Sequence, residues 1–238
     1  MDILDSSISS NLKRIQEKIQ ASSVKRRGGQ KPVTLVAVTK NIGVEDIREA
    51  VQSGVKHLGE SKIQEAKEKY KYLGPIATWH LVGHLQTNKS RPAAGLFDWI
   101  QSLDALRTAE ALSRHVQSLE RTLDVLVEVN ITEEPKKYGV PPGEALSLIR
   151  EIARRPGLRL RGLMAMAPWV EDAELTRPFF RRTADLFLEA GSLPEVGERW
   201  DVLSMGMTND FPVAVEEGST MVRIGTGIFR TGRRAQRS

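Results

Sequence analysis

The chain has 238 residues, of which 40% are hydrophobic and 27% charged, as expected for a globular protein with one large domain or two small ones. It contains no cysteine, which excludes disulfides, thiolate nucleophiles and cysteine-ligated zinc. No stretch approaches the ~18 uninterrupted apolar residues of a membrane span, and the amino-terminal segment has no apolar signal core. We therefore expect a cytoplasmic protein with no membrane partner.

The formal net charge of +5 is concentrated in two basic segments, residues 25–31 and the carboxyl-terminal tail. Neither segment has interleaved aromatic side chains. Such charge runs add at most weak, salt-sensitive affinity for phosphates, and at chain ends they are usually solvated. We expect no nucleic-acid partner, and we expect residues 228–238 to form a flexible basic tail.

Short apolar segments alternate with amphipathic helical patterns along the whole chain. A helix is predicted first, over residues 8–22. The predicted strands are residues 34–39, 56–60, 78–83, 97–103, 123–130, 158–166, 200–206 and 220–225. The predicted helices between them are residues 44–53, 63–73, 105–119, 143–155, 177–190 and 210–218.

Eight strands separated by helices or helical turns predict one (β/α)8 TIM barrel, a single domain over residues 1–238, with an extra amino-terminal helix. A doubly wound open sheet is the alternative. That fold usually has fewer strands and a glycine fingerprint after the first strand, where this chain has VTKNIG. The barrel is therefore the better prediction.

Glycine and small hydroxyl residues occur where a barrel commonly binds phosphate, in the loops after strands seven and eight. These loops read LSMGMTND and VRIGTGIF, and they contain Ser204, Gly206, Thr208, Gly225, Thr226 and Gly227. Glycine lets backbone N–H groups approach a phosphate closely. We predict a phosphate site here, although one such loop alone would indicate no more than a turn.

Strand alternation places Arg223 inside the barrel and Lys40 at its mouth. A buried guanidinium needs a partner, either an internal carboxylate such as Glu128 or a ligand atom. Barrel closure makes the first and eighth strands neighbours, so both side chains should meet the phosphate loop. A lysine, a phosphate cradle and a polar partner for a ring nitrogen indicate a pyridoxal phosphate site, with Lys40 as the Schiff base. The segment TLVAVTKN alone equally suits a solvated lysine at a strand end.

The chain resembles the pyridoxal 5′-phosphate homeostasis protein family, single-domain relatives of the barrel domain of alanine racemase. The resemblance is carried by LVAVTK (35–40), HLGESKIQEAKEKY (57–70), WHLVGHLQTNK (79–89), VLVEVNITEEPKKYGV (125–140), RGLMAMAP (161–168) and LSMGMTNDFPVAVEEGSTMVRIGTGIF (203–229). These segments span most of the chain, and the last is especially specific.

The resemblance implies a cofactor, pyridoxal 5′-phosphate, bound as a Schiff base on Lys40 with Arg223 facing the pyridine nitrogen. It implies phosphate contacts from Ser204, Gly225 and Thr226, with Met205 and Asn88 nearby. The family usually has Gly-Glu-Asn where this chain has Ser61 in place of the asparagine, so any role of that amide is open.

The function implied is intracellular pyridoxal phosphate (vitamin B6) homeostasis without robust turnover, by a monomer or weak dimer whose partners are the cofactor and pyridoxal-dependent apoenzymes. The alternatives are an amino-acid racemase or a Schiff-base aldolase acting on a sugar phosphate. Racemisation needs acid–base groups on both faces of the adduct, and alanine racemases take one, a tyrosine, from a second domain. An arginine at the ring nitrogen also makes the ring a weaker electron sink.

The histidines give no metal signature. His80 and His84 are four residues apart, which suits zinc on a helix, but they fall in a predicted strand end and loop without an adjacent acid. His57 and His115 look isolated. We predict no metal site.

Overall fold

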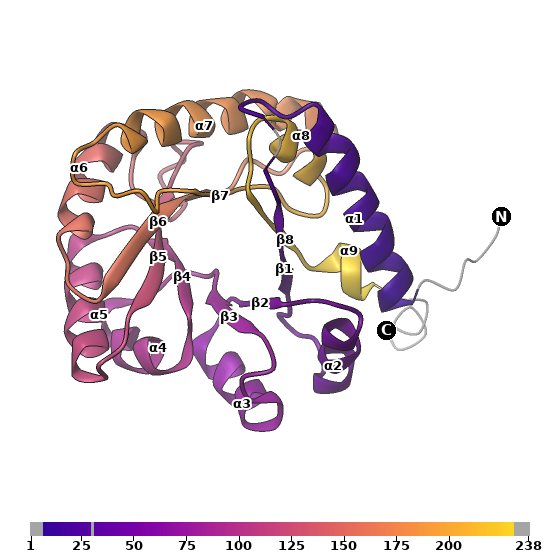
Figure 1. Ribbon diagram of the computed structural model, residues 1–238, viewed down its shortest axis with the longest axis horizontal. Helices are drawn as coiled ribbons and strands as arrows, with labels where there is room; N and C mark the ends of the chain where they lie inside the picture. Colours follow the sequence, from indigo (N-terminus) through magenta and orange to yellow (C-terminus); the bar gives the residue numbers. More distant parts are fainter. Residues whose placement is uncertain (1–6, 30, 231–238) are drawn as a thin grey trace.

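The computed structural model describes residues 7–29 and 31–230. Eight parallel strands form a closed barrel in chain order, and β8 pairs with β1 to close it (Figure 1). The strands are β1 (Thr34–Val38), β2 (His57–Glu60), β3 (Thr78–Leu81), β4 (Trp99–Leu103), β5 (Leu123–Val129), β6 (Leu158–Ala165), β7 (Val202–Ser204) and β8 (Met221–Ile224). The predicted (β/α)8 fold is confirmed, and each strand lies within its predicted segment.

Helices surround the barrel on its outer side (Figure 1). They are α1 (Ile8–Val24), α2 (Val44–Gln52), α3 (Ile63–Leu73), α4 (Ser90–Leu96), α5 (Leu106–Ser118), α6 (Pro142–Ala153), α7 (Arg177–Gly191), α8 (Phe211–Glu216) and α9 (Thr226–Phe229), with 3-10 turns η1 (Thr87–Lys89) and η2 (Ala173–Thr176). In the described part of the chain, none of these helices has the length and apolar character needed to cross a membrane.

The sequence pattern did not predict α4 and α9. The α4 segment SRPAAGL contains Pro92 and Gly95, the two residue types with the poorest helix propensity, so it reads as a loop. The α9 segment is a single turn of four residues, too short to show a helical period.

The barrel separates two apolar regions. Outward side chains such as Ala37 and Leu58 join the large cluster that also contains the buried helix residues. A smaller cluster fills the inside of the barrel and consists of Val36, Trp99, Leu126, Met164, Val202 and Met221. Polar residues take the remaining interior positions, and these residues form the candidate site.

Helix α1 braces the end of the chain that carries the loop after β8. It runs beside α8 and α9, and the amide of Asn11 donates a hydrogen bond of 2.9 Å from Nδ2 to the carbonyl of Ile228 (Figure 1). Ile228 and Phe229 lie in α9 and are buried, so the prediction of a tail starting at residue 228 was wrong at its start. Residues 231–238, the rest of that predicted tail, lie outside the described residues.

The first basic segment is paired with acids. Nη1 of Arg27 lies 3.3 Å from Oε2 of Glu217, and Nζ of Lys25 lies 3.7 Å from Oε1 of Glu216. Nη2 of Arg26 donates to the carbonyl of Gly218 at 2.7 Å. These charges therefore join α1 to the end of α8.

Leu12→Ala should lower the free energy of unfolding by about 3 kcal/mol, because it leaves a cavity between α1 and the barrel. Leu12 is 2% exposed. Val24→Ala is the matched control on the same helix: Val24 is 70% exposed, so its loss should change stability by no more than about 0.5 kcal/mol. Urea unfolding measures both, and equal effects would contradict the bracing role of α1.

Candidate functional site

Lys40 lies beside the loop that follows β8. Val36 pairs with Arg223 and Ala37 with Ile224, so the two chains leave the barrel together at its carboxyl edge. A Cβ added to Gly225 would lie 3.2 Å from the carbonyl oxygen of Val38, which places this loop against the end of β1. The Lys40 side chain is exposed, and among the described residues none forms a hydrogen bond or ion pair with its amine.

The loops after β7 and β8 meet through Thr208. Its Oγ1 accepts a hydrogen bond from the backbone N–H of Gly227 at 3.2 Å and lies 3.2 Å from Oγ1 of Thr226. Within the described residues, the backbone N–H groups of Gly225 and Thr226 have no acceptor. These free donors and the two hydroxyls form a cradle suited to an anion.

Gly206 allows the loop after β7 to turn toward this cradle. Its φ is 93°, and a Cβ there would lie 2.6 Å from Cβ of Ala214 and 2.9 Å from Cα of Phe211. A larger residue is therefore excluded by both its conformation and its space.

Arg223 extends from β8 into the barrel and is 4% exposed. Its Nη1 donates to Oγ of Ser204 at 2.6 Å, and its Nη2 donates to the carbonyl of Ala165 at 3.0 Å. Burial lowers the pKa of the guanidinium to about 10, although the carboxylates of Glu128 and Asp210 oppose this effect. Arg223 is therefore a cation at neutral pH, held in one orientation by two neighbouring strands.

Ser204 lies inside the barrel and is fully buried. Its hydroxyl accepts from Arg223 and donates to Oε1 of Gln101 at 2.7 Å, so both of its hydrogen-bonding roles are already used. The phosphate contact expected of Ser204 stays a prediction, and these two bonds join Ser204 to the interior of the barrel. The hydroxyl of Thr208, four residues further on, is the one that contacts the cradle residues Thr226 and Gly227.

The hydrogen bonds continue from Ser204 through the barrel interior. Nε2 of Gln101 lies 2.9 Å from Nδ1 of His80, and Nε2 of His80 lies 3.0 Å from Nδ1 of His57. A chain of five side chains thus connects Arg223 to His57 at the start of β2. His57 is not isolated, contrary to its appearance in the sequence, and Gln101 is a part of the site that the sequence did not reveal.

Glu128 lies on the interior face of β5 and is 3% exposed. Burial and the nearby Asp104 raise its pKa and Arg223 lowers it, and the net result is a pKa of about 7. No direct ion pair joins Glu128 to Arg223 in the described structure; the contact predicted between them is a longer-range attraction. Glu128 is thus a carboxyl group that changes charge near neutral pH.

The opposite side of the mouth carries a second polar group. Nδ1 of His84 lies 3.4 Å from Oδ2 of Asp104, and the His84 ring stacks on Tyr138 with centroids 3.9 Å apart. His80 is directed into the interior chain instead. Within the residues described, no three His, Asp or Glu side chains gather as a metal site requires.

The three remaining predicted positions differ in their surroundings. Asn88 is exposed in η1 beyond the end of β3. Met205 is fully buried in the outer apolar cluster, so its side chain faces away from the barrel interior. Ser61 follows β2, and a Cβ on Gly83 would lie only 2.2 Å from its carbonyl oxygen, so the loops after β2 and β3 pack backbone to backbone.

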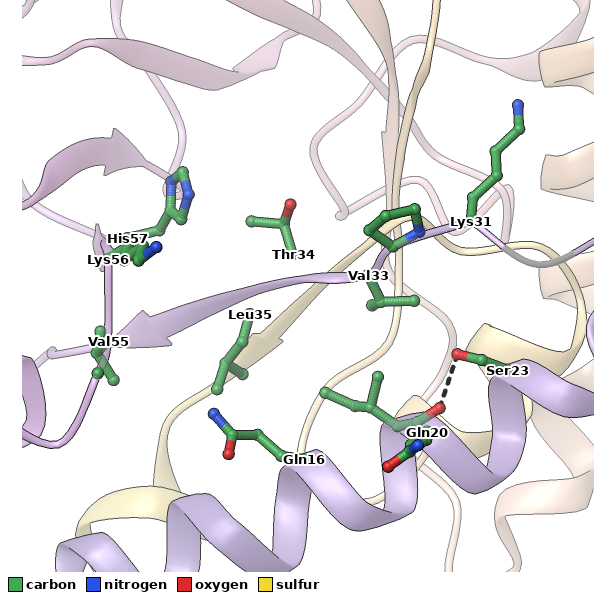
Figure 2. A pocket seen from close by; sticks show the side chains of 13 residues that line it. Gln16, Gln20, Ser23, Lys31, Val33, Thr34, Leu35, Val55, Lys56 and His57 are labelled. Carbon is green, nitrogen blue, oxygen red and sulfur yellow. Dashed lines mark hydrogen bonds between the residues drawn. The ribbon is translucent and has the colours of Figure 1, made fainter.

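A pocket of about 610 Å³ lies at the other end of the barrel (Figure 2). Gln16 and Gln20 of α1, Thr34 and Leu35 at the start of β1, and His57 line it. It opens at the amino ends of the strands, whereas Lys40 and the phosphate cradle lie at the carboxyl ends. This pocket is therefore separate from the candidate site.

A closed barrel with a lysine after its first strand and a glycine loop after its eighth defines the class: the sequence model of the alanine racemase N-terminal domain matches residues 7–231. Curated relatives narrow the class. The pyridoxal phosphate homeostasis protein of Pasteurella multocida (strain Pm70) is 40% identical over 227 residues, covering 93% of this chain and 96% of that protein. That of Escherichia coli (strain K12) is 37% identical over 229 residues, covering 93% and 95%.

A solved structure agrees with these relatives. PipY of Synechococcus elongatus PCC7942, described with pyridoxal phosphate bound, has a TM-score of 0.82 and 34% identity, covering 94% of this chain and 100% of that one. The chain belongs to the pyridoxal phosphate homeostasis protein family, and the family predicted from its sequence is confirmed.

Glu128→Gln should change the pH dependence of stability. With a pKa raised to about 7, the folded protein binds the Glu128 proton more tightly than the unfolded chain does, so Glu128 stabilises at low pH and this contribution is lost as pH rises toward 7. Glutamine stays neutral and avoids that loss. The variant should gain stability relative to wild type between pH 5 and pH 8, by up to about 3 kcal/mol.

Urea unfolding of both proteins at each pH measures this difference, and subtraction cancels other titrating groups that the two proteins share. A difference that stays constant from pH 5 to pH 8 would show that Glu128 titrates normally in the folded state.

Proposed function

We propose that this chain binds pyridoxal 5′-phosphate reversibly at the carboxyl edge of β1 and β8. In this role it stores the cofactor within the cell, with its reactive aldehyde sequestered, and does not turn over a substrate. The observation that carries the proposal is the convergence of a free lysine amine, an anion cradle and a buried cation on two paired strands. The names of the relatives support the same cofactor and the same role.

The phosphate group fits the cradle between the β7 and β8 loops. The free backbone N–H groups of Gly225 and Thr226 donate to it, and the hydroxyls of Thr226 and Thr208 supply further donors. Gly225 has no Cβ, which keeps this face of the loop open beside the carbonyl of Val38. In this arrangement Thr208 joins the phosphate residues predicted from the sequence, namely Ser204, Gly225 and Thr226.

The aldehyde of the cofactor supplies a carbon for attack by a lysine amine. Lys40 would hold the cofactor through its amine, and the aldehyde would supply reversible Schiff-base chemistry there, with water released on binding and consumed on release. Lys40 is suited to this because its amine has no competing partner among the described residues. Reversibility is what a protein that stores and releases the cofactor requires.

Arg223 favours storage of the cofactor over its use in catalysis. It faces the pyridine nitrogen in this proposal and is already cationic, so it opposes protonation of that nitrogen and makes the ring a poorer acceptor of electrons. Ser204 and the Ala165 carbonyl hold the guanidinium in place. The recipients of released cofactor would be pyridoxal-dependent apoenzymes.

Lys40→Ala should abolish the visible Schiff-base absorption expected of the wild-type protein with added pyridoxal phosphate, because Lys40 is the amine proposed to bind the aldehyde. Titration followed by absorbance measures this. Exchange of the exposed Lys13 on α1 for alanine is the control and should leave the band unchanged. A band that survives in Lys40→Ala would contradict the assignment.

Amino-acid racemisation by the loaded protein should be slower than in dedicated racemases by at least about a thousandfold. In this proposal Arg223 opposes protonation of the ring nitrogen. The general acid and base that racemases use account for about 10²–10⁴ in rate. Chiral chromatography at saturating alanine measures it. Turnover comparable with metabolic enzymes, about 10 per second, would overturn the proposal that the protein stores the cofactor without catalysis.

A further inference from the structure

The turn that carries Lys40 contacts a cluster of charged side chains from β2 and α3. β1 ends at Val38, and Thr39 is fully buried while Lys40 is exposed. Asn41 has a φ of 60°, in the left-handed region that asparagine adopts more readily than most residues other than glycine. The N–H of Ile42 donates to the carbonyl of Thr39 at 2.9 Å and closes the turn, and a partner outside the turn restricts it further.

Lys69 of α3 provides that partner. Its ammonium donates to the carbonyl of Thr39 at 2.5 Å, to Oε1 of Glu60 at 2.6 Å and to Oε1 of Glu65 at 2.7 Å. All three of its donors are thereby used. The side chain of Lys69 is 9% exposed and that of Glu60 is fully buried, so water competes little for these bonds.

The two carboxylates complete the cluster on the other atoms of the turn. Oε1 of Glu65 accepts the backbone N–H of Asn41 at 2.6 Å, and Oε1 of Glu60 accepts the hydroxyl of Thr39 at 2.5 Å. The carbonyl of Thr39, before Lys40, and the N–H of Asn41, after it, are therefore both hydrogen-bonded to this cluster. Since a peptide unit is planar, fixing one atom of each flanking unit fixes the main-chain orientation of Lys40.

Holding a turn with charges is costly. Burial raises the pKa of Glu60, and hydrogen bonds from Lys69 and Thr39 oppose this effect. Partial burial acts on Glu65 in the same direction, but the bonds from Lys69 and Asn41 outweigh it and its pKa is lowered. Apolar contacts would hold α3 against β2 without this cost. The charges differ from such contacts in reaching the backbone on both sides of Lys40.

We propose that Lys69, Glu60 and Glu65 are positioning residues that fix the Thr39–Asn41 turn and aim Lys40 at the mouth of the barrel. The inference rests on the proposed role of Lys40 as the Schiff-base residue. The cluster does not touch the cofactor; it spares Lys40 the cost of ordering its main chain when the covalent bond forms.

Lys69→Met tests this inference with two ligands. Pyridoxal phosphate should bind at least about tenfold more weakly than to wild type, the effect of losing one charge-assisted hydrogen bond. Pyridoxine 5′-phosphate, which has an alcohol in place of the aldehyde and uses only the non-covalent contacts, should bind with unchanged affinity. Absorbance follows the first ligand and calorimetry the second. A collapsed pocket would weaken both.

Amide hydrogen exchange in the ligand-free protein gives an independent readout. The N–H of Asn41 should exchange at least about tenfold faster in Lys69→Met and in Glu65→Met, whereas Glu65→Gln keeps the acceptor oxygen and should stay near wild type. Glu65 is 23% exposed, so its variants serve if Lys69→Met does not fold.

Arg159→Met is the control for loss of a partly buried ion pair. Arg159 bonds Asp124 at 2.8 and 2.9 Å at the opposite end of the barrel, and its loss should leave pyridoxal phosphate affinity and Asn41 exchange unchanged. Wild-type affinity in a folded Lys69→Met protein would overturn this inference alone. A wild-type protein that forms no Schiff base would overturn the proposed function, and this inference with it.

Discussion

The parallel pairing of β8 with β1 is the constraint on which the site depends. It places Val36 opposite Arg223 and Ala37 opposite Ile224, so residues almost 190 positions apart in the chain leave the barrel at one edge. Backbone hydrogen bonds set this register, and a slip of one residue would exchange the inward and outward faces of β8. Arg223 would then face the helices, and Ile224 would face the cofactor. Lys40 and the loop after β8 lie at the same edge because the barrel is closed.

The same register places Arg223 among polar side chains inside the barrel. Small barrels are usually filled with branched apolar side chains, and here six of these positions are apolar. Other interior positions are polar, and a hydrogen-bonded chain runs from Arg223 through Ser204, Gln101 and His80 to His57. A buried cation is tolerated only when its donors are paired, so the chain and the fixed orientation of Arg223 are one arrangement. Such rigidity suits the proposed storage of the cofactor, which requires no group to move for turnover.

Sequence alone predicted the parts of the site that follow from period and closure. Alternation along TLVAVTK and MVRIG was enough to place Lys40 at the mouth and Arg223 inside, and the glycines marked the loop after β8. The interior partners of Ser204 could not be predicted, because its position at the end of a strand suits both a loop and an interior role. Gln101 could not be recognised, because its partners lie far away in the chain. Lys69, within EAKEKYKY, looked like one of several lysines on a helix surface.

The most direct test of the account is to locate the covalent bond. The protein is loaded with pyridoxal phosphate, reduced with borohydride so that the Schiff base becomes a stable amine, digested, and mapped by mass spectrometry. The account predicts one modified peptide, with the pyridoxyl group on Lys40. Modification spread over surface lysines with Lys40 unmodified would contradict it, because the cradle and Arg223 would then not direct the cofactor to that amine.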